Sequence, residues 1–382
     1  MSFNQTRIIL VRHGRSTYND QQRYQGCCDE SVLTEQGKHQ AFQTGIALNK
    51  INFDAIYASP LTRTQETAKE ILRVTNSSAK LHLNSNLKEV NLPGWQGLEY
   101  KYVRQYLKQE YQNWEENPHE FTIETLESNG QTLVKTKTKP VLQLYEQAKN
   151  FWQEILPLHQ GKTVLVVSHG GTIRALISTA TQIKAHHYHA IQQSNSGISI
   201  LDFENTASSN AKITAINLTQ HLGEVLPKLK NGKHGLRLLL LPVNLPVNSH
   251  NTQANDYTDK ITQFLKNVDL NFCLSNHIHD AESIVESIIE SHSNTPVHLQ
   301  VSRQDFLDTW HQQISKRSLD YNALSTGLIV ADTNTISHTL SQILGLKSTT
   351  SLNINPGEIT VLFYPTSQNK PVLQAMNING SF

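Results

Sequence analysis

Two short apolar runs, each ending in a polar turn with a histidine, constrain the fold of this chain more than any other feature. The run at 8–11 leads into Arg12 and His13, and the run at 164–167 leads to His169. Unbroken apolar runs of this length are too short for helices and are typical of parallel strands buried on both faces. Because ligands of open α/β sheets bind beyond the carboxyl ends of the strands, both histidines are predicted to stand at a site.

The residues around His13 have the chemistry to attack and hold a phosphoryl group. A neutral imidazole is a nucleophile when a backbone acceptor keeps the proton on its other nitrogen. Arg12 offers a planar guanidinium that fits phosphoryl oxygens, and Asn19 and loop amides add neutral donors. His169, held protonated or hydrogen-bonded, would stabilise charge in the transition state. An Arg-His-Gly tripeptide alone is also compatible with a purely structural histidine, so the interpretation depends on the whole pattern.

A second cation and a loop are predicted to complete the phosphate site. Residues Asp54–Ala58 are predicted to form a strand. Ser59 is the expected N-cap of the helix that follows and Pro60 its first residue, which places Arg63 in the first turn. The N-terminus of a helix favours anions, although an isolated arginine is more often a solvated surface residue. Loop amides near Gly26 are expected to line the floor of the pocket.

Glu89 is the candidate proton donor. It lies in LKEVNLPGWQGL, a loop that contains glycine, proline and tryptophan. A carboxylate beside a phosphate is repelled and tends to keep a proton, which suits a general acid that protonates a leaving alkoxide. The alternative is a solvated loop glutamate.

Residues 98–160 are predicted to be helical and amphipathic, and to form an insertion that roofs the site. Lys101 and Arg104 are either contacts to a substrate carboxylate or solvated charges. The aromatic residues of this insertion are expected to be packed: Tyr106, Trp114, Tyr145 and Trp152.

Four separated strings together resemble the histidine phosphatase (phosphoglycerate mutase-like) superfamily: RHGRSTYN, SPLTRTQETA, the Glu89 loop and SHGGTIRALI. The resemblance implies in-line attack of His13 on phosphorus, a phosphohistidine, and no metal or other cofactor. It implies that Glu89 protonates the leaving oxygen and later activates water. The implied catalytic residues are His13, Glu89, Arg12, Arg63 and His169, and the implied phosphate- or substrate-binding residues are Arg12, Asn19, Gly26, Arg63, His169 and Gly170.

Within the superfamily, the chain is similar to the carboxyarabinitol-1-phosphate phosphatases of photosynthetic organisms, which implies a small anionic sugar phosphate as substrate. Phosphoserine phosphatase and phosphoglycerate mutase are the alternatives. A cofactor-dependent mutase is expected to carry a Glu-x-x-Tyr-Gly-like segment, whereas VNLPGWQGL follows Glu89 and favours hydrolysis. A protein that binds phosphorylated ligands without turnover is the alternative of a different class.

Composition limits the partners and the compartment. The 33 basic and 32 acidic residues nearly balance, which argues against a nucleic-acid or membrane-surface protein. Three cysteines, Cys27, Cys28 and Cys273, indicate no disulfide framework. With no secretory leader in MSFNQTRIILVRHG and no long apolar run, a soluble cytoplasmic protein is expected. The expected partners are a small phosphate ester and, as an option, a second copy of the chain.

The second half of the chain repeats the pattern of the first without its histidines. After RLLLL at 237–241, Pro242, Val243 and Asn244 stand where the first half has Arg12, His13 and Gly14, and Asp332 stands at the His169 position. We therefore expect a three-layer α/β/α phosphoglycerate mutase-like domain at 1–222, a linker at 223–235 and a degenerate second copy of the same fold at 236–382.

Charge and histidine spacing place the chemistry in the first domain. Residues 231–382 carry 9 basic and 12 acidic side chains, so an anionic substrate is expected to bind elsewhere. His277 and His279 invite a metal interpretation, but two histidines without further ligands are more often surface residues.

Overall fold

The computed structural model describes residues 5–379 except 76, 129–132, 205–209, 231, 244–251, 277–278, 293, 301–302, 317–322 and 367–369. The chain forms two compact units, Met1–Ile213 with Gly345–Lys347, and Thr214–Leu344 with Ser348–Phe382. The domain boundaries expected from the sequence stay a prediction. In the part of the chain that is described, no helix is long and apolar enough to cross a membrane. All three cysteines are free thiols.

The sheet of the first unit brings the two histidine-bearing strand ends together. Its strand order is β8-β7-β1-β6-β2-β3. β1 pairs in parallel with β6, and Arg12 lies opposite Ser168 in their register. The apolar runs within these two strands are completely buried, as predicted. The strands are β1 (Thr6–Arg12), β2 (Ala55–Ala58), β3 (Leu81–Leu83), β6 (Thr163–Ser168), β7 (Ile198–Phe203) and β8 (Ala211–Leu218), the last of which runs on into the second unit.

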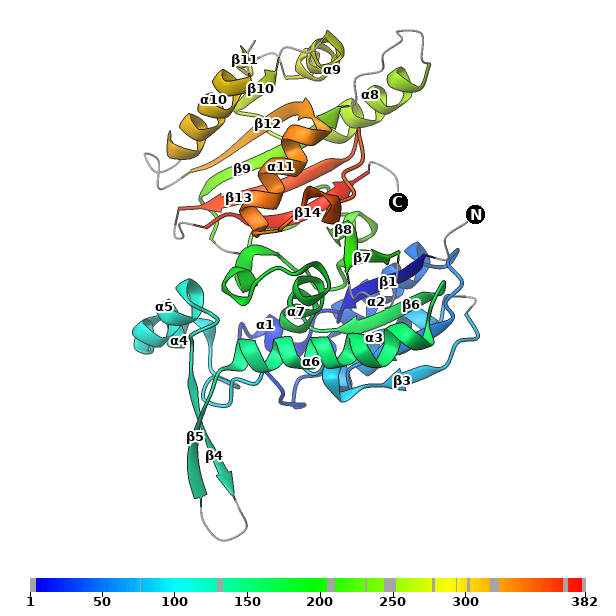
Figure 1. The fold of residues 1–382 in the computed structure, drawn as a ribbon, viewed down its shortest axis with the longest axis vertical. Helices are drawn as coiled ribbons and strands as arrows, with labels where there is room; N and C mark the ends of the chain where they lie inside the picture. The colour runs from blue at the N-terminus through cyan, green and yellow to red at the C-terminus, as the bar shows by residue number, and fades with distance from the viewer. Residues whose placement is uncertain are drawn as a thin grey trace. The chain divides into compact units, whose positions relative to one another are not determined.

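Two helix pairs cover the sheet and give the expected three-layer α/β/α arrangement (Figure 1). α2 packs against α3, and α6 packs against α7. The helices are α1 (Thr17–Asp20), α2 (Glu35–Ala47), α3 (Thr62–Leu72), α6 (Pro140–Ile155) and α7 (Gly170–Thr181), with 3₁₀ turns η1 (Ser85–Leu87), η2 (Leu156–Leu158), η3 (Ala185–Ala190) and, in the second unit, η4 (Gln220–Leu222).

The predicted start of α3 was wrong, although Arg63 does lie in its first turn. Leu61 is the N-cap residue and its side chain makes no capping bond. The helix is capped from a distant loop, because an Asp29 carboxylate oxygen accepts from Thr62 N at 2.6 Å. Ser59, the predicted N-cap, instead hydrogen-bonds to His169 Nε2 at 2.9 Å.

The insertion between β3 and α6 is only partly helical, which corrects the prediction for 98–160. It contains α4 (Tyr100–Tyr106), α5 (Lys108–Glu116) and an antiparallel hairpin of β4 (Ile123–Ser128) and β5 (Leu133–Thr138). Figure 1 shows the hairpin extending away from the sheet of its own unit. The sequence Asn129-Gly130 between the strands is a typical hairpin signal that outweighs the helical pattern.

Most of the aromatic residues of this segment are packed, as predicted. Trp114, Tyr145 and Trp152 are at most 7% exposed. Tyr106 is the exception and is 65% exposed. It is the last residue of α4, and its ring lies against that of Tyr102 one turn earlier, with centroids 4.8 Å apart.

The second unit repeats the topology of the first. Its strand order is β11-β10-β12-β9-β13-β14, in which β9 is parallel to β12 and antiparallel to β13, as β1 is to β6 and β7. Its elements are β9 (Gly235–Val243), α8 (Thr252–Leu265), β10 (Phe272–Asn276), α9 (His279–Glu290), β11 (Val297–Gln300), α10 (Arg303–Lys316), β12 (Leu324–Asp332), α11 (Thr333–Leu344), η6 (Thr349–Ser351), β13 (Ile359–Pro365) and β14 (Val372–Ile378).

The register of β9 and β12 matches the alignment of the two halves. Pro242 lies opposite Ala331, as Arg12 lies opposite Ser168. Val243 and Asp332 therefore occupy the places of the two histidines. Asn244, His277 and the side chain of His279 lie outside the described residues.

Candidate active site

His13 is held in the tautomer that a nucleophile requires. It follows β1 and is 2% exposed, and its backbone N–H donates to Ser168 O at 2.9 Å. Its ring Nδ1 lies 2.8 Å from Gly14 O. Because a carbonyl oxygen only accepts, the proton is on Nδ1 and the ring lone pair is on Nε2.

His169 lies next to His13 at the end of β6. The two ring centroids are 5.3 Å apart. His169 is completely buried, and burial, together with the charges of Arg63, His13 and Arg12, lowers its pKa well below the ordinary 6.5. The ring is therefore neutral at neutral pH, and its Nε2 hydrogen-bonds to the Ser59 hydroxyl at 2.9 Å. The predicted role of His169 beside a phosphate stays a prediction. Its Nδ1 is a buried polar atom without a partner.

Arg12 and Arg63 bring two buried guanidiniums to the same place. Arg12 Nη1 donates to Gln193 O at 2.9 Å, and Arg63 donates to Cys28 O and Gly26 O, each at 2.9 Å. Among the described residues, neither arginine forms an ion pair, and the Nε of each is buried without a partner. Burial lowers the pKa of both groups. Buried positive charges held only by carbonyls are suited to binding an anion.

The Glu89 carboxylate lies against the N-terminus of α7. One oxygen accepts from Val90 N at 2.8 Å and from Thr172 N at 3.1 Å, and the other accepts from Gly171 N at 3.1 Å. A Cβ on Gly171 would overlap both Glu89 Oε1 and the Tyr188 hydroxyl. The glycine is therefore required for the approach of the carboxylate. The charge of Glu89 raises the pKa of Arg12 and of Arg63, against the larger effect of burial, so it lies within electrostatic reach of both.

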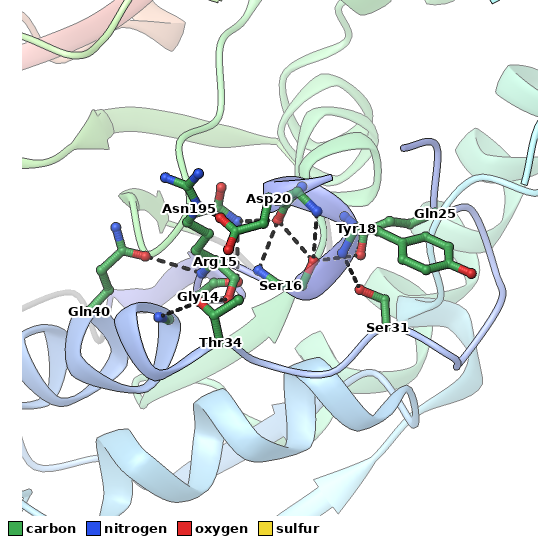
Figure 2. A network of polar contacts seen from close by, with 12 residues as sticks. Gly14, Arg15, Ser16, Tyr18, Asp20, Gln25, Ser31, Thr34, Gln40 and Asn195 are labelled. Atoms are coloured by element: carbon green, nitrogen blue, oxygen red, sulfur yellow. Dashed lines mark hydrogen bonds and ion pairs between the residues drawn. The ribbon is translucent and has the colours of Figure 1, made fainter. Parts of the chain in front are cut away.

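Asn19 belongs to the hydrogen-bond network that shapes the turn after β1. Figure 2 shows Ser16 and Asn195, two of its partners in this network. Its Oδ1 accepts from the backbone and hydroxyl of Ser16 at 3.3 and 3.1 Å, and from Asn195 Nδ2 at 3.0 Å. It also hydrogen-bonds to Tyr100, where it opposes the rise in pKa that burial causes. The predicted donor thus lies beside the site, within a network that fixes its position.

The two glycines predicted to bind substrate contact the guanidiniums. Gly26 has φ +54° and supplies its carbonyl to Arg63, whereas the sequence suggested loop amides. A Cβ on Gly170 would lie 3.3 Å from Arg12 Nε. Gly170 therefore leaves room for Arg12, whereas a Cβ on Gly26 would meet the Gln96 side chain.

Three further residues at the site were missed by the sequence analysis. Asn195 Nδ2 donates to the backbone carbonyls of His13 and Gly14 at 3.0 and 3.3 Å. The charge of Arg12 lowers the pKa of Tyr100 against burial, and Arg174 lies on α7 close to Arg12. The Ser-Asn-Ser-Gly string at 194–197 signals only a turn, and nothing local indicates what its asparagine contacts.

No group of three or more His, Cys, Asp or Glu side chains arranged to hold a metal ion is found within the described ranges. The fold and the site together define an α/β domain with a mixed sheet, in which two histidines and two arginines that form no ion pair among the described residues lie near the strand ends. The family model of the histidine phosphatase superfamily (branch 1) matches residues 8–216, and the chain belongs to this superfamily.

Relatives within the superfamily carry different names. A 2-carboxy-D-arabinitol-1-phosphatase of Triticum aestivum is 35% identical over 197 residues, which is 52% of this chain and 37% of that protein. Phosphoserine phosphatase 1 of Hydrogenobacter thermophilus is 30% identical over 218 residues, 57% of this chain and 95% of that protein. The chain thus spans less than half the length of the plant relative. A crystal structure of phosphoserine phosphatase from Entamoeba histolytica in complex with 3-phosphoglyceric acid has a TM-score of 0.44 and 29% identity, covering 57% of this chain and 99% of that one.

Proposed function

We propose that the chain is a phosphoric monoester hydrolase that works through a phosphohistidine on His13. The observation that carries the proposal is the hydrogen bond from His13 Nδ1 to Gly14 O, which keeps the lone pair on Nε2. Two further observations support the proposal. The buried ring of His169 has its centroid 5.3 Å from that of His13, and the Nε atoms of Arg12 and Arg63 are buried without a partner. A nucleophile surrounded by cationic and neutral donors suits phosphoryl transfer.

The proposed reaction has two steps. His13 Nε2 attacks phosphorus, the N–P bond forms, and the bond from phosphorus to the ester oxygen breaks while the Glu89 carboxyl gives its proton to the leaving alkoxide. The Glu89 carboxylate then takes a proton from water as the water oxygen attacks phosphorus. The N–P bond breaks, and inorganic phosphate leaves neutral His13 behind.

The remaining proposed groups hold the phosphoryl oxygens through both steps. Arg12, Arg63 and His169 would donate to the equatorial oxygens, with Asn19 assisting. Because these groups supply the positive charge that a magnesium ion provides in other phosphoryl-transfer sites, we expect turnover in EDTA.

The proposed substrate is a small anionic phosphate ester. 2-Carboxy-D-arabinitol 1-phosphate is the first candidate, supported by the name of the wheat relative. Phosphoserine is the second, because the alignment with the Hydrogenobacter phosphoserine phosphatase covers 95% of that protein. Phosphoglycerate mutase activity and ligand binding without turnover are the alternatives. Assaying a panel of phosphate esters for release of inorganic phosphate distinguishes them from hydrolysis. A homodimer stays a prediction.

The test is hydrolysis of p-nitrophenyl phosphate in EDTA by the wild type, His13→Ala and His39→Ala. His39 is exposed on α2 and serves as the matched control. We expect His13→Ala to lose at least about a thousandfold in kcat, whereas His39→Ala keeps wild-type activity. The wild type should form an acid-labile phosphoenzyme that His13→Ala lacks. Full activity in His13→Ala refutes the nucleophile, and a wild type that binds phosphate without hydrolysing any ester supports the binding protein.

A further inference from the structure

Two arginines lie along one face of α7: Arg12, which comes from β1, and Arg174, which belongs to α7 itself. Residues four apart on a helix share a face, so Arg174 lies one turn beyond Gly170. The Arg12 guanidinium lies over Gly170, because a Cβ there would be 3.3 Å from Arg12 Nε. Arg174 therefore lies one helical turn along α7 from the position that Arg12 covers.

A single loop holds both side chains. Arg174 Nε donates to Ile191 O at 2.7 Å, and Arg12 Nη1 donates to Gln193 O at 2.9 Å. The Arg174 guanidinium also lies over the Tyr188 ring, 5.6 Å from its centroid, and hydrogen-bonds to that side chain. Arg174 is thus fixed in place while its side chain remains partly exposed.

The charge of Glu89 acts on Arg12 from a distance, but a direct salt bridge to this pair is absent from the described residues. Among the described residues, neither Arg12 nor Arg174 forms an ion pair, and the nearby Glu89 is bound to the amides at the start of α7. The charge of Arg174 adds to burial in lowering the pKa of Arg12. Two adjacent like charges are unfavourable unless a ligand brings two negative groups to them.

We propose that Arg174 determines specificity by binding a carboxylate of the substrate. The inference rests on the proposed function, in which the phosphoryl group lies at Arg12 and His13. The planar fork of an arginine suits two-point binding of a carboxylate. Because Arg12 covers Gly170 and Arg174 lies one helical turn further along α7, the pair suits a short phosphorylated hydroxy acid with its carboxylate a few carbon atoms from the ester oxygen.

The cations that the sequence suggested for this role are less well placed. Lys101 and Arg104 are both exposed on α4. The Arg104 guanidinium lies over the Tyr111 ring, 5.4 Å from its centroid. Lys101 therefore provides a matched control, since its replacement removes one positive charge from the same unit.

The experiment measures preference within two substrate pairs that differ by a carboxylate: 3-phosphoglycerate against glycerol 3-phosphate, and phosphoserine against phosphoethanolamine. Arg174→Gln keeps an N–H donor for Ile191 O but removes the positive charge. Arg174→Lys keeps the positive charge but removes the planar guanidinium that binds a carboxylate at two points. We expect the wild type to prefer a carboxylate-bearing ester in kcat/KM, and Arg174→Gln to lower that preference about 10- to 100-fold. Arg174→Lys should retain part of it, and Lys101→Met all of it.

Binding of the same esters to His13→Ala, measured by calorimetry, gives the preference independently of turnover. If the wild type hydrolyses no ester, the proposed function fails. The role of Arg174 is then still tested by the ratio of affinities for the two esters of each pair, measured in His13→Ala and in His13→Ala with Arg174→Gln. The inference is overturned by a wild type without preference in either pair, by an Arg174→Gln variant that keeps the preference, or by an equal loss in Lys101→Met. An equal loss of kcat/KM for both esters of each pair would mean that Arg174 has a purely structural role, and this result also overturns the inference.

Discussion

Replacing Asn195 by aspartate should disrupt the turn that carries His13 without changing the size of the side chain. Asn195 Nδ2 donates to His13 O, Gly14 O and Asn19 Oδ1 at 3.0, 3.3 and 3.0 Å. Two of these acceptors are backbone carbonyls, so the amide nitrogen must face them. An ionised aspartate offers only acceptors, and its carboxylate would turn three attractive contacts into repulsive ones.

The expected loss follows from the two protons of the amide nitrogen, which the three acceptors share. A hydrogen bond contributes about 1 kcal/mol net, so Asn195→Ala should lower the free energy of unfolding by about 2 kcal/mol. Asn195→Asp should lower it further, because it adds repulsion. Activity should fall as well, since Gly14 O also accepts from His13 Nδ1 at 2.8 Å. A shift of that carbonyl tilts the nucleophile, and a misplacement of about 1 Å costs about a hundredfold in rate.

Urea unfolding followed by tryptophan fluorescence and single-turnover formation of the phosphoenzyme provide the two measurements. Asn210→Asp is the matched control, because Asn210 is exposed and already accepts a hydrogen bond from Gln182. We expect Asn195→Asp to be less stable and slower than Asn195→Ala, and Asn210→Asp to resemble the wild type. An Asn195→Asp protein that matches Asn210→Asp in both measurements would refute the reasoning.

Two further predictions concern the start of α7. Gly171→Ala should fold but lose at least about tenfold in kcat, because the added Cβ displaces Glu89 and Tyr188; unchanged steady-state kinetics would contradict this. Burial, aided by the charge of Arg63, lowers the pKa of His169 below 6.5, so the unfolded chain binds a proton that the folded chain does not. Stability should therefore fall as the pH drops below about 6.5, and less steeply in His169→Asn. Identical pH dependence of the urea midpoints of the two proteins would count against that explanation.

The strand ends could be predicted from the sequence because their signals are local. The apolar runs and the polar turns that follow them are contiguous, and β1 and β6 are parallel neighbours in the sheet. The start of α3 could not be predicted in this way. Its capping carboxylate, Asp29, lies 33 residues before Thr62, and Ser59 is recruited by His169, 110 residues away.

The hairpin and Asn195 were missed for different reasons. The hairpin has a local signal in Asn129-Gly130, which the helical appearance of the flanking segments concealed. The donors of Asn195 reach carbonyls 182 and 181 residues earlier in the chain. That contact exists only because β7 pairs antiparallel with β1, with Val11 opposite Ile198, and no pattern within the turn encodes it.

The two units show what the site requires beyond the shared topology. In the second unit, Asp332 precedes α11 and caps it locally, accepting from Thr335 N at 2.9 Å. In the first unit, His169 occupies the equivalent position and its side chain makes no capping bond. The amides at the start of α7 are instead bound by Glu89, which lies more than 80 residues earlier in the chain. With a histidine at this strand end, a carboxylate from elsewhere satisfies the helix, and in this chain that carboxylate is the candidate proton donor, Glu89, which lies within electrostatic reach of Arg12 and Arg63.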